Sequence, residues 1–236
     1  MAEDQAMPEY VLSFKPTTTG FGIHDPSAVI FEDGVPVYGI EEERLSRRKH
    51  AENQFPERAI RACLDYCDVS LSEIDEIYLP YKPELLSKLI ISNVRNAVQN
   101  PSFVGRSAST DSSGSVLGNI ATVTDTVDRY LAARSGDLVA VVERRLERSF
   151  AAPLPPITTL EHHRCHAASA YYPADFADGL VLTLDGRGEY DSTVVWHAAN
   201  GELSRGRTYT HPNSLGHFFA AVTEFLGYRA FNGEGK

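Results

Sequence analysis

The chain has 236 residues, of which 42% are hydrophobic and 23% are charged, a composition typical of a globular protein with a substantial core. Its net charge of −10 argues against binding to the phosphate backbone of a nucleic acid. The chain has only three cysteines, which argues against a disulfide framework. Its acidic start has no signal-peptide core, which argues against secretion. It also has no apolar run of about 18 residues, which argues against a membrane span. We therefore expect a cytoplasmic protein with no nucleic-acid and no membrane partner.

Three strands are predicted near the start of the chain, after a disordered lead-in at residues 1–8. The strands are expected at residues 10–14, 27–31 and 35–40. The pair Asp33 and Gly34 separates the last two, and Asp-Gly between β-rich runs is a strong hairpin signal. These two strands are therefore expected to run antiparallel.

The middle of the chain alternates between helical and extended patterns. Pro56 is a favourable first residue for a helix, and apolar residues follow it at helical spacing as far as Cys67. The next expected elements are a strand at 74–79, an amphipathic helix at 83–99, a Ser-, Gly- and Asp-rich loop at 100–118, a helix at 120–150 and a strand at 157–160.

A second β-rich unit begins at Gly179 and repeats the plan of the first. Its strands are predicted at residues 180–184, 192–197 and 205–209, with glycine-containing turns between them. A final helix is expected to begin at about Ser214. The chain therefore contains two similar strand-rich segments.

His162 and His166 lie four residues apart in a segment predicted to be helical, which places both imidazoles on one face. Asp185 follows an apolar, β-branched run, where a predicted strand passes into a glycine turn. Two imidazoles and a carboxylate could bind a divalent transition metal with open positions for substrate. A helix with partly exposed histidines beside a turn aspartate fits the same residues, so both interpretations stay open.

His24 precedes Asp25 at the start of the first hairpin, and its imidazole could act as a general base near neutral pH. A turn histidine beside an Asx turn is the simpler interpretation of the spacing alone.

A cationic run follows the hairpin, formed by Arg44, Arg47, Arg48, Lys49 and His50. This run could bind an oxyanion or phosphate, or could be a solvated surface that offsets the three glutamates before it.

Glycines at two places could let a phosphate approach the backbone. Gly186 and Gly188 lie in the turn after Asp185, which matches neither a Walker loop nor a complete GxGxxG motif. Ser214 and Gly216 precede the last predicted helix and could supply hydroxyl and backbone donors to an anion, or serve only as a helix cap.

Taken together, these motifs resemble, in order and spacing, the N-terminal part of the O-carbamoyltransferases of antibiotic and nodulation-factor biosynthesis. The matching segments are residues 22–28, 41–44, 48–56, 162–170, 184–189, 214–216, 226–227 and 234–236. Each motif is modest alone, whereas the combination is specific. The resemblance covers almost the whole chain except residues 83–150.

The resemblance implies an α/β protein with the duplicated ribonuclease-H-like fold of the actin-like ATPases, the first subdomain complete and the second truncated. The implied domains are a disordered lead-in at 1–8, a first subdomain at 9–176 with a helical insertion at about 83–150, and the start of a second subdomain at 177–236. The repeated strand-rich segments agree with such a duplication.

The implied activity has two steps: ATP and carbamoyl phosphate give carbamoyladenylate, and the carbamoyl group then passes to a hydroxyl of a small molecule or sugar. In such an enzyme His162, His166 and Asp185 would hold a divalent metal, with Fe(II) expected and Zn or Mn as alternatives.

The resemblance also implies roles for residues outside this metal set. His24 would deprotonate the acceptor hydroxyl. Lys49 would contact carbamoyl phosphate, with Arg48 and Arg44 as nearby candidates. The residues implied in nucleotide binding are Gly186, Gly188, Ser214, Gly216 and Glu234.

A further metal-ligating aspartate, much of the adenine pocket and a separate C-terminal domain would lie beyond residue 236. The missing C-terminal region is thus an expected partner, and the 236-residue chain alone is expected to bind metal weakly and to be inactive or nearly so. Two alternatives remain: an enzyme similar to the tRNA threonylcarbamoyl transferases, and an inactive fragment or paralogue that binds a metal or nucleotide.

Overall fold

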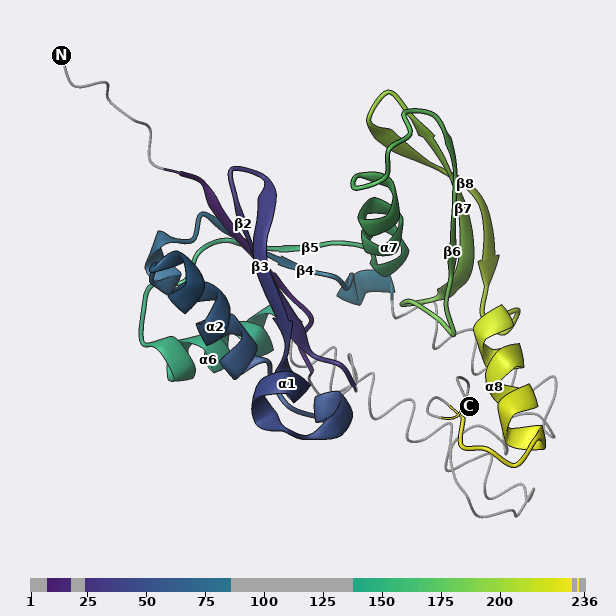
Figure 1. The fold of residues 1–236 in the computed structure, drawn as a ribbon, viewed down its shortest axis with the longest axis horizontal. Helices are drawn as coiled ribbons and strands as arrows, with labels where there is room; N and C mark the ends of the chain where they lie inside the picture. The colour runs from purple at the N-terminus through teal and green to yellow at the C-terminus, as the bar shows by residue number, and fades with distance from the viewer. Residues whose placement is uncertain (1–7, 18–23, 86–137, 231–232, 234–236) are drawn as a thin grey trace. The chain divides into compact units, whose positions relative to one another are not determined.

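The computed structural model describes residues 8–17, 24–85, 138–230 and 233. These residues fall into two compact units, shown in Figure 1. The first unit contains 8–17, 24–83 and 138–160, and the second contains 84–85, 161–230 and 233. Each unit has its own sheet, so the chain is an α/β protein.

The first unit is built on a five-stranded sheet with the order β3-β2-β1-β4-β5. Its strands are β1 (Tyr10–Phe14), β2 (Ser27–Glu32), β3 (Val35–Glu41), β4 (Glu76–Leu79) and β5 (Ile157–Thr159). β2 pairs antiparallel with both β1 and β3, whereas β4 pairs parallel with β1 and β5. This order and these directions are those of a ribonuclease-H-like sheet, which confirms the predicted fold class for this unit.

The turn between β2 and β3 follows the predicted hairpin chemistry. Asp33 and Gly34 have φ values of 51° and 77°, and a type I′ turn requires this left-handed conformation at both central residues. The Asp33 carboxylate also accepts the backbone N–H of Glu9 at 2.9 Å. The turn thereby fixes the chain just before β1.

Two helices of the first unit pack beside each other. α2 (Glu57–Cys67) contacts β2 and β3 through its apolar face, formed by Ala59, Ile60, Cys63 and Leu64. α6 (Leu138–Phe150) lies alongside α2 in Figure 1. Arg61 of α2 donates to the carbonyl oxygen of Ser149, and its guanidinium lies 4.6 Å from the centre of the Phe150 ring. The described part of the predicted helix at 120–150 is therefore helical.

The segment after β3, which contains the cationic run, forms two short helices. It forms α1 (Glu42–Ser46) and a short 3₁₀ helix, η1 (Lys49–Ala51). The buried carboxylate of Glu42 accepts the backbone N–H of Ala59 at 2.9 Å. This contact joins α1 to the start of α2, and tertiary contacts of this kind stabilise helices too short to form alone. Two further 3₁₀ turns are η2 (Leu71–Glu73) and η3 (Pro83–Leu85).

The second unit contains a three-stranded antiparallel sheet with the order β6-β7-β8. Its elements are α7 (His162–Tyr171), β6 (Gly179–Leu184), β7 (Asp191–Ala199), β8 (Glu202–Thr210) and α8 (Leu215–Phe225). The three strands repeat the β1-β2-β3 arrangement of the first unit, as the duplication predicts.

α7 packs against β6 and β7 in the second unit. Its Ala167 and Tyr171 join Val181, Val194 and Trp196 in one apolar core. The first subdomain is predicted at residues 9–176, whereas contacts group residues from 161 onward with the second unit. The strand pattern locates the second sheet, but it does not reveal which sheet the preceding helix covers.

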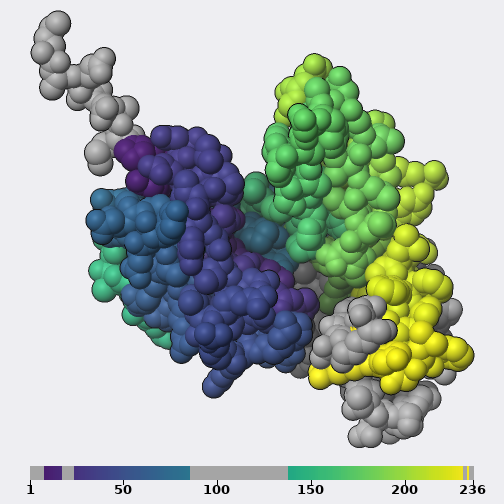
Figure 2. Space-filling view, viewed as in Figure 1, coloured from purple at the N-terminus to yellow at the C-terminus, as the bar shows by residue number. Residues whose placement is uncertain are grey.

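α8 lies at the surface of the second unit and is drawn in yellow in Figure 2. Its apolar side chains are largely exposed, with Phe218 at 67% and Phe225 at 89%. On β6, Leu180, Leu182 and Leu184 are also exposed. Among the described residues, none of the helices combines the length and apolar character needed to cross a membrane.

Candidate metal centre

Two histidines at the start of α7 lie on one face of the helix. His162 is its first residue and His166 follows one turn later, so their ring centres are 4.5 Å apart. Their Nε2 atoms are separated by 3.0 Å. The side chain of His162 is 15% exposed and that of His166 is 52% exposed. Solvent therefore has access to the histidine pair from the side of His166.

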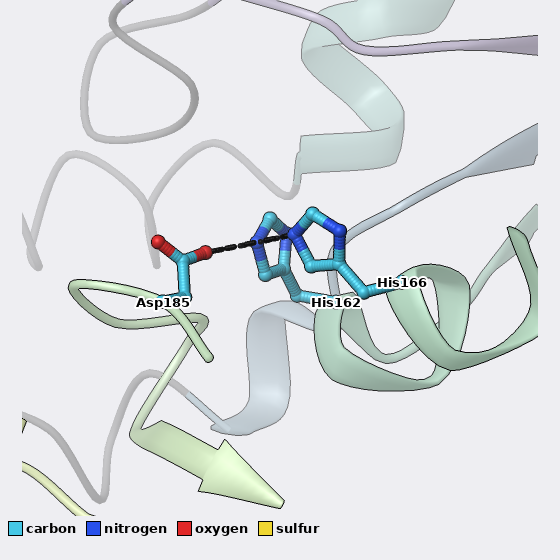
Figure 3. Close-up of side chains that lie close together, drawn as sticks. All are labelled: His162, His166 and Asp185. Atoms are coloured by element: carbon cyan, nitrogen blue, oxygen red, sulfur yellow. Dashed lines mark hydrogen bonds and ion pairs between the residues drawn. The ribbon is translucent and has the colours of Figure 1, made fainter. Parts of the chain in front are cut away.

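Asp185 brings a carboxylate to this pair. It follows the last residue of β6, and its N–H donates to the carbonyl oxygen of Ser192 at 2.9 Å. Its Oδ2 lies 2.8 Å from Nε2 of His162 and 3.6 Å from Nε2 of His166. Figure 3 shows both imidazoles directed at the carboxylate. The structure thus brings together the three residues predicted as metal ligands.

The donor atoms and their spacing fit a divalent transition metal. Two atoms that each lie about 2.1 Å from one ion are roughly 3.0–3.5 Å apart when their angle at the ion is between 90° and the tetrahedral value. The three separations here are 2.8, 3.0 and 3.6 Å. Two imidazole nitrogens and one carboxylate suit Fe(II), Zn or Mn and leave positions for substrate oxygens.

The carboxylate of Asp185 is held in its ionised form. Burial raises its pKa, but hydrogen bonds from His162 and His166 outweigh burial and hold the pKa well below the ordinary aspartate value. The N–H of Gly186, 2.6 Å from Oδ1, stabilises the same anion. A metal ion binds the deprotonated carboxylate, so Asp185 is ready to act as a ligand at neutral pH.

Buried polar contacts fix the start of α7. Glu189 is 4% exposed, and its carboxylate accepts the backbone N–H of His162 at 3.2 Å. This N–H needs such a partner because the first N–H groups of a helix have none within the helix. Arg205 of β8 pairs with Glu161, the cap residue of α7, and with Asp191 of β7. These contacts hold His162 in place against its own sheet.

His163 lies beside the candidate ligands but belongs to the core. It is 1% exposed, with Nε2 2.9 Å from the carbonyl oxygen of Asp191 and Nδ1 2.9 Å from the hydroxyl of Thr183. A carbonyl oxygen only accepts, so Nε2 carries the proton and Nδ1 accepts from Thr183. Burial lowers the pKa of His163, which keeps the ring neutral. Its role is structural.

We expect His163→Leu to lower the free energy of unfolding by about 2–3 kcal/mol, because two buried polar groups lose their partner. Urea unfolding followed by circular dichroism measures this change. His197→Leu, on the exposed side of β7, is the matched control and should change stability by less than about 0.5 kcal/mol. Equal losses in the two variants would contradict the structural role of His163.

The turn after Asp185 packs against the start of α8. The hydroxyl of Ser214 lies 2.7 Å from the carbonyl oxygen of Gly186, to which it donates, and it accepts the N–H of His217 at 3.0 Å. A Cβ atom at Gly216 would lie 2.5 Å from the backbone N of Gly186. Three of the predicted nucleotide-binding residues therefore meet beside Asp185.

Gly188 and Glu234 are the other two predicted nucleotide-binding residues. Gly188 lies against the metal-site helix, because a Cβ atom there would be 3.0 Å from the ring of His163. Glu234 lies outside the described residues, as does most of the predicted insertion at 83–150.

The predicted carbamoyl phosphate residues belong to the first unit. Lys49 Nζ lies 3.2 Å from a carboxylate oxygen of Glu43, and Arg44 pairs with Glu43 and Glu41 at 3.6 and 3.3 Å. Lys49, Arg44 and Arg48 are all exposed. Neighbouring glutamates thus neutralise part of the positive charge of this cationic run, while its side chains remain exposed to solvent.

His24 lies in the same unit, with Nδ1 2.7 Å from the carboxylate of Asp25. A second group of potential metal ligands is formed by Asp25, Glu43 and His50. Its carboxylates already accept hydrogen bonds, that of Glu43 from Lys49 and from the N–H of His50. We therefore interpret this group as a hydrogen-bond network.

Arg205, which supports the helix of the candidate ligands, and the contact of His50 with Asp25 in the first unit were not predicted. Arg205 pairs with Glu161 across 44 positions of the chain, and His50 pairs with Asp25 across 25. No local pattern marks such pairs. Among these supporting residues, only Glu189 lies in a motif that the sequence singles out, because it ends the glycine-containing segment after Asp185.

Comparisons with known proteins identify a family for the chain. A family model described as the carbamoyltransferase N-terminus matches residues 18–236. The chain is 30% identical over 213 residues to the uncharacterised protein sll1178 of Synechocystis sp., and 29% identical over 217 residues to the nodulation protein NolNO of Sinorhizobium fredii. These alignments cover 90% and 89% of the chain but 32% and 26% of the relatives. The chain thus spans about a third or less of their length.

Similarity to solved structures is distant. YeaZ from Pseudomonas aeruginosa is 14% identical with a TM-score of 0.36, covering 86% of the chain and 68% of YeaZ. The ethanolamine utilization protein EutJ from Carboxydothermus hydrogenoformans is also 14% identical, with a TM-score of 0.33, covering 98% of the chain and 62% of EutJ. The match to the family model over residues 18–236 decides the assignment. The chain belongs to the carbamoyltransferase N-terminus family.

Proposed function

We propose that this chain forms the metal- and phosphate-binding part of an O-carbamoyltransferase. The enzyme makes carbamoyladenylate from ATP and carbamoyl phosphate and then transfers the carbamoyl group to a hydroxyl of a small molecule or sugar. Family membership supports carbamoyl transfer. The observation that carries the chemistry is the convergence of His162, His166 and Asp185 on one point.

His162, His166 and Asp185 hold the divalent metal in this proposal, with Fe(II) expected and Zn or Mn as alternatives. A metal held by these residues would supply Lewis acidity for phosphate oxygens and would offset the negative charge of ATP and carbamoyl phosphate. The protein contributes an ionised carboxylate and a largely buried imidazole whose helix is anchored by Glu189. The half-exposed ring of His166 leaves the solvent side open to substrate.

The turn after Asp185 and the start of α8 form the nucleotide phosphate site of the proposal. Gly186 has no side chain, so a phosphate can approach the backbone of this turn closely, and Gly216 lets the start of α8 pack against the turn. The N–H of His217 already donates to Ser214, so the backbone N–H groups of Leu215 and Gly216 are the proposed donors for an anion at the start of α8. Ser214 already donates to Gly186 and accepts from His217, so its hydroxyl shapes this turn.

In the transfer step, Nε2 of His24 takes the proton of the acceptor hydroxyl. The acceptor oxygen forms a bond to the carbamoyl carbon, while the bond from that carbon to the phosphate oxygen breaks and AMP leaves with the electron pair. In the first step, the exposed ammonium of Lys49 binds carbamoyl phosphate, with Arg44 and Arg48 nearby. Water converts carbamoyl phosphate to carbamate and phosphate, and a carbamate oxygen then bonds to the α-phosphorus of ATP while pyrophosphate leaves.

The complete carbamoyltransferase that contains this chain provides the test. With Fe(II) and ATP, we expect pyrophosphate release that requires carbamoyl phosphate. Lys49→Gln should raise the KM for carbamoyl phosphate about tenfold or more, because one charge-assisted hydrogen bond is lost. Pyrophosphate release that does not depend on carbamoyl phosphate, or transfer from threonylcarbamoyl adenylate to tRNA, would contradict the proposed function.

A further inference from the structure

The carboxylate of Asp25 lies between two imidazoles. Its Oδ2 is 2.7 Å from Nδ1 of His24, and its Oδ1 is 2.9 Å from Nδ1 of His50. Burial raises the pKa of Asp25, but hydrogen bonds from His50 and His24 outweigh burial and lower it. An ionised carboxylate only accepts hydrogen bonds, so both Nδ1 atoms carry a proton. In neutral His24 the free lone pair is then on Nε2.

The backbone holds Asp25 in this position. Its φ of 54° is in the left-handed region, which aspartate tolerates better than most residues, and its N–H donates to the carbonyl oxygen of His50 at 2.8 Å. His50 is also left-handed, with φ of 62°, and its N–H donates to Glu43 at 2.6 Å. Asp25 and His50 are thus joined through both backbone and side chain, which restricts rotation of the carboxylate.

Glu43 extends the same network to Lys49. Both carboxylate oxygens of Glu43 lie 3.2 Å from Lys49 Nζ. The side chain of Glu43 is 8% exposed and that of Lys49 is 72% exposed, so a buried anion anchors a cation that faces solvent. Consecutive contacts therefore connect His24 with Lys49 through Asp25, His50 and Glu43.

We propose that Asp25 is the positioning residue of His24. It holds the imidazole in the tautomer with hydrogen on Nδ1 and stabilises the imidazolium that forms when Nε2 takes a proton, as a buried aspartate does for a catalytic histidine in hydrolases. The inference rests on the proposed function. The proton moves from the acceptor hydroxyl to Nε2, and the Nδ1 hydrogen stays on the ring. The His24 side chain is 55% exposed, which gives the acceptor access.

Long-range ¹⁵N–¹H correlation spectra of the 236-residue chain at about pH 8 show the tautomer of neutral histidines directly. We expect hydrogen on Nδ1 of His24 in the wild type and on Nε2, the form that free histidine prefers, in Asp25→Gly. Glycine tolerates the left-handed backbone, so this variant removes the carboxylate without straining the turn. Asp33→Asn, at another left-handed aspartate of the same unit, is the matched control and should leave His24 unchanged. An unchanged tautomer in Asp25→Gly would overturn the proposal.

Kinetics of the complete enzyme give a second readout. Asp25→Asn should lower kcat for carbamoyl transfer by roughly 100-fold with little change in the KM for the acceptor, because the group supports the transition state. A kcat equal to the wild type, or an effect confined to KM, would overturn the positioning role. A wild-type enzyme without carbamoyl transfer would overturn the proposed function, and the spectra would still decide whether Asp25 positions His24.

Discussion

Replacing His166 by alanine is expected to lower the affinity of the 236-residue chain for Fe(II), Mn(II) or Zn(II) at least 100-fold. His166 supplies one of three protein ligands, and loss even of an outer partner of a metal ligand lowers affinity by roughly 10- to 100-fold. Its side chain is half exposed, so its removal should leave the core of the second unit intact. Anaerobic calorimetric titration measures the affinity.

Two variants make this titration specific. His197→Ala removes an exposed histidine of β7 in the same unit and should leave the affinity unchanged. Asp185→Asn should weaken binding as strongly as His166→Ala, because it removes the anionic ligand. Equal affinities in the wild type, His166→Ala and His197→Ala would exclude this site.

Replacing Gly216 by alanine is expected to lower both stability and metal affinity. The new Cβ would lie 2.5 Å from the backbone N of Gly186 and 2.8 Å from the carbonyl oxygen of Asp185. Backbone atoms cannot rotate away as a flexible side chain can, so α8 and the turn must separate. Overpacking of this kind costs about 1–3 kcal/mol. Because the turn carries Asp185, we also expect metal affinity to fall about tenfold.

Gly179→Ala, at the start of β6, is the control for Gly216→Ala. Its Cβ would meet only the ring of Phe176, 3.1 Å away, a side chain that is 43% exposed and can shift more easily than backbone atoms can. Urea unfolding of the metal-free proteins and metal titration compare the two variants. Similar stability and similar affinity in both would show that the approach of α8 to the turn does not position Asp185.

Local signals predicted much of the two sheets. The bounds of β1, β2 and β3 agree with the sequence analysis to within one residue, because alternation and the Asp33-Gly34 turn both act locally. α1 was missed since it depends on the contact of Glu42 with the start of α2. α7 likewise covers the second sheet because it packs on β6 and β7, in the apolar core that contains Tyr171 and Trp196, and no local spacing encodes this choice.

The spacing of residues in the sequence predicted the two histidine ligands, but it did not predict the residues that hold them in place. A four-residue separation on a helix places His162 and His166 together whatever the rest of the chain does. The closeness of Asp185 depends on how β6 and α7 pack, so the residue pattern alone left open whether its carboxylate meets the two histidines. The hydrogen bond between Asp25 and His50 joins two left-handed turns, so it became visible only in three dimensions.

The most direct test of the central claim is anomalous diffraction from crystals of the chain grown with Fe(II) or Mn(II), recorded at the absorption edge of that metal. We predict one strong peak within about 2.3 Å of Nε2 of His162, Nε2 of His166 and a carboxylate oxygen of Asp185. A metal bound elsewhere, or these three side chains without a peak at saturating metal, would contradict the claim that they form the metal centre of this carbamoyltransferase chain.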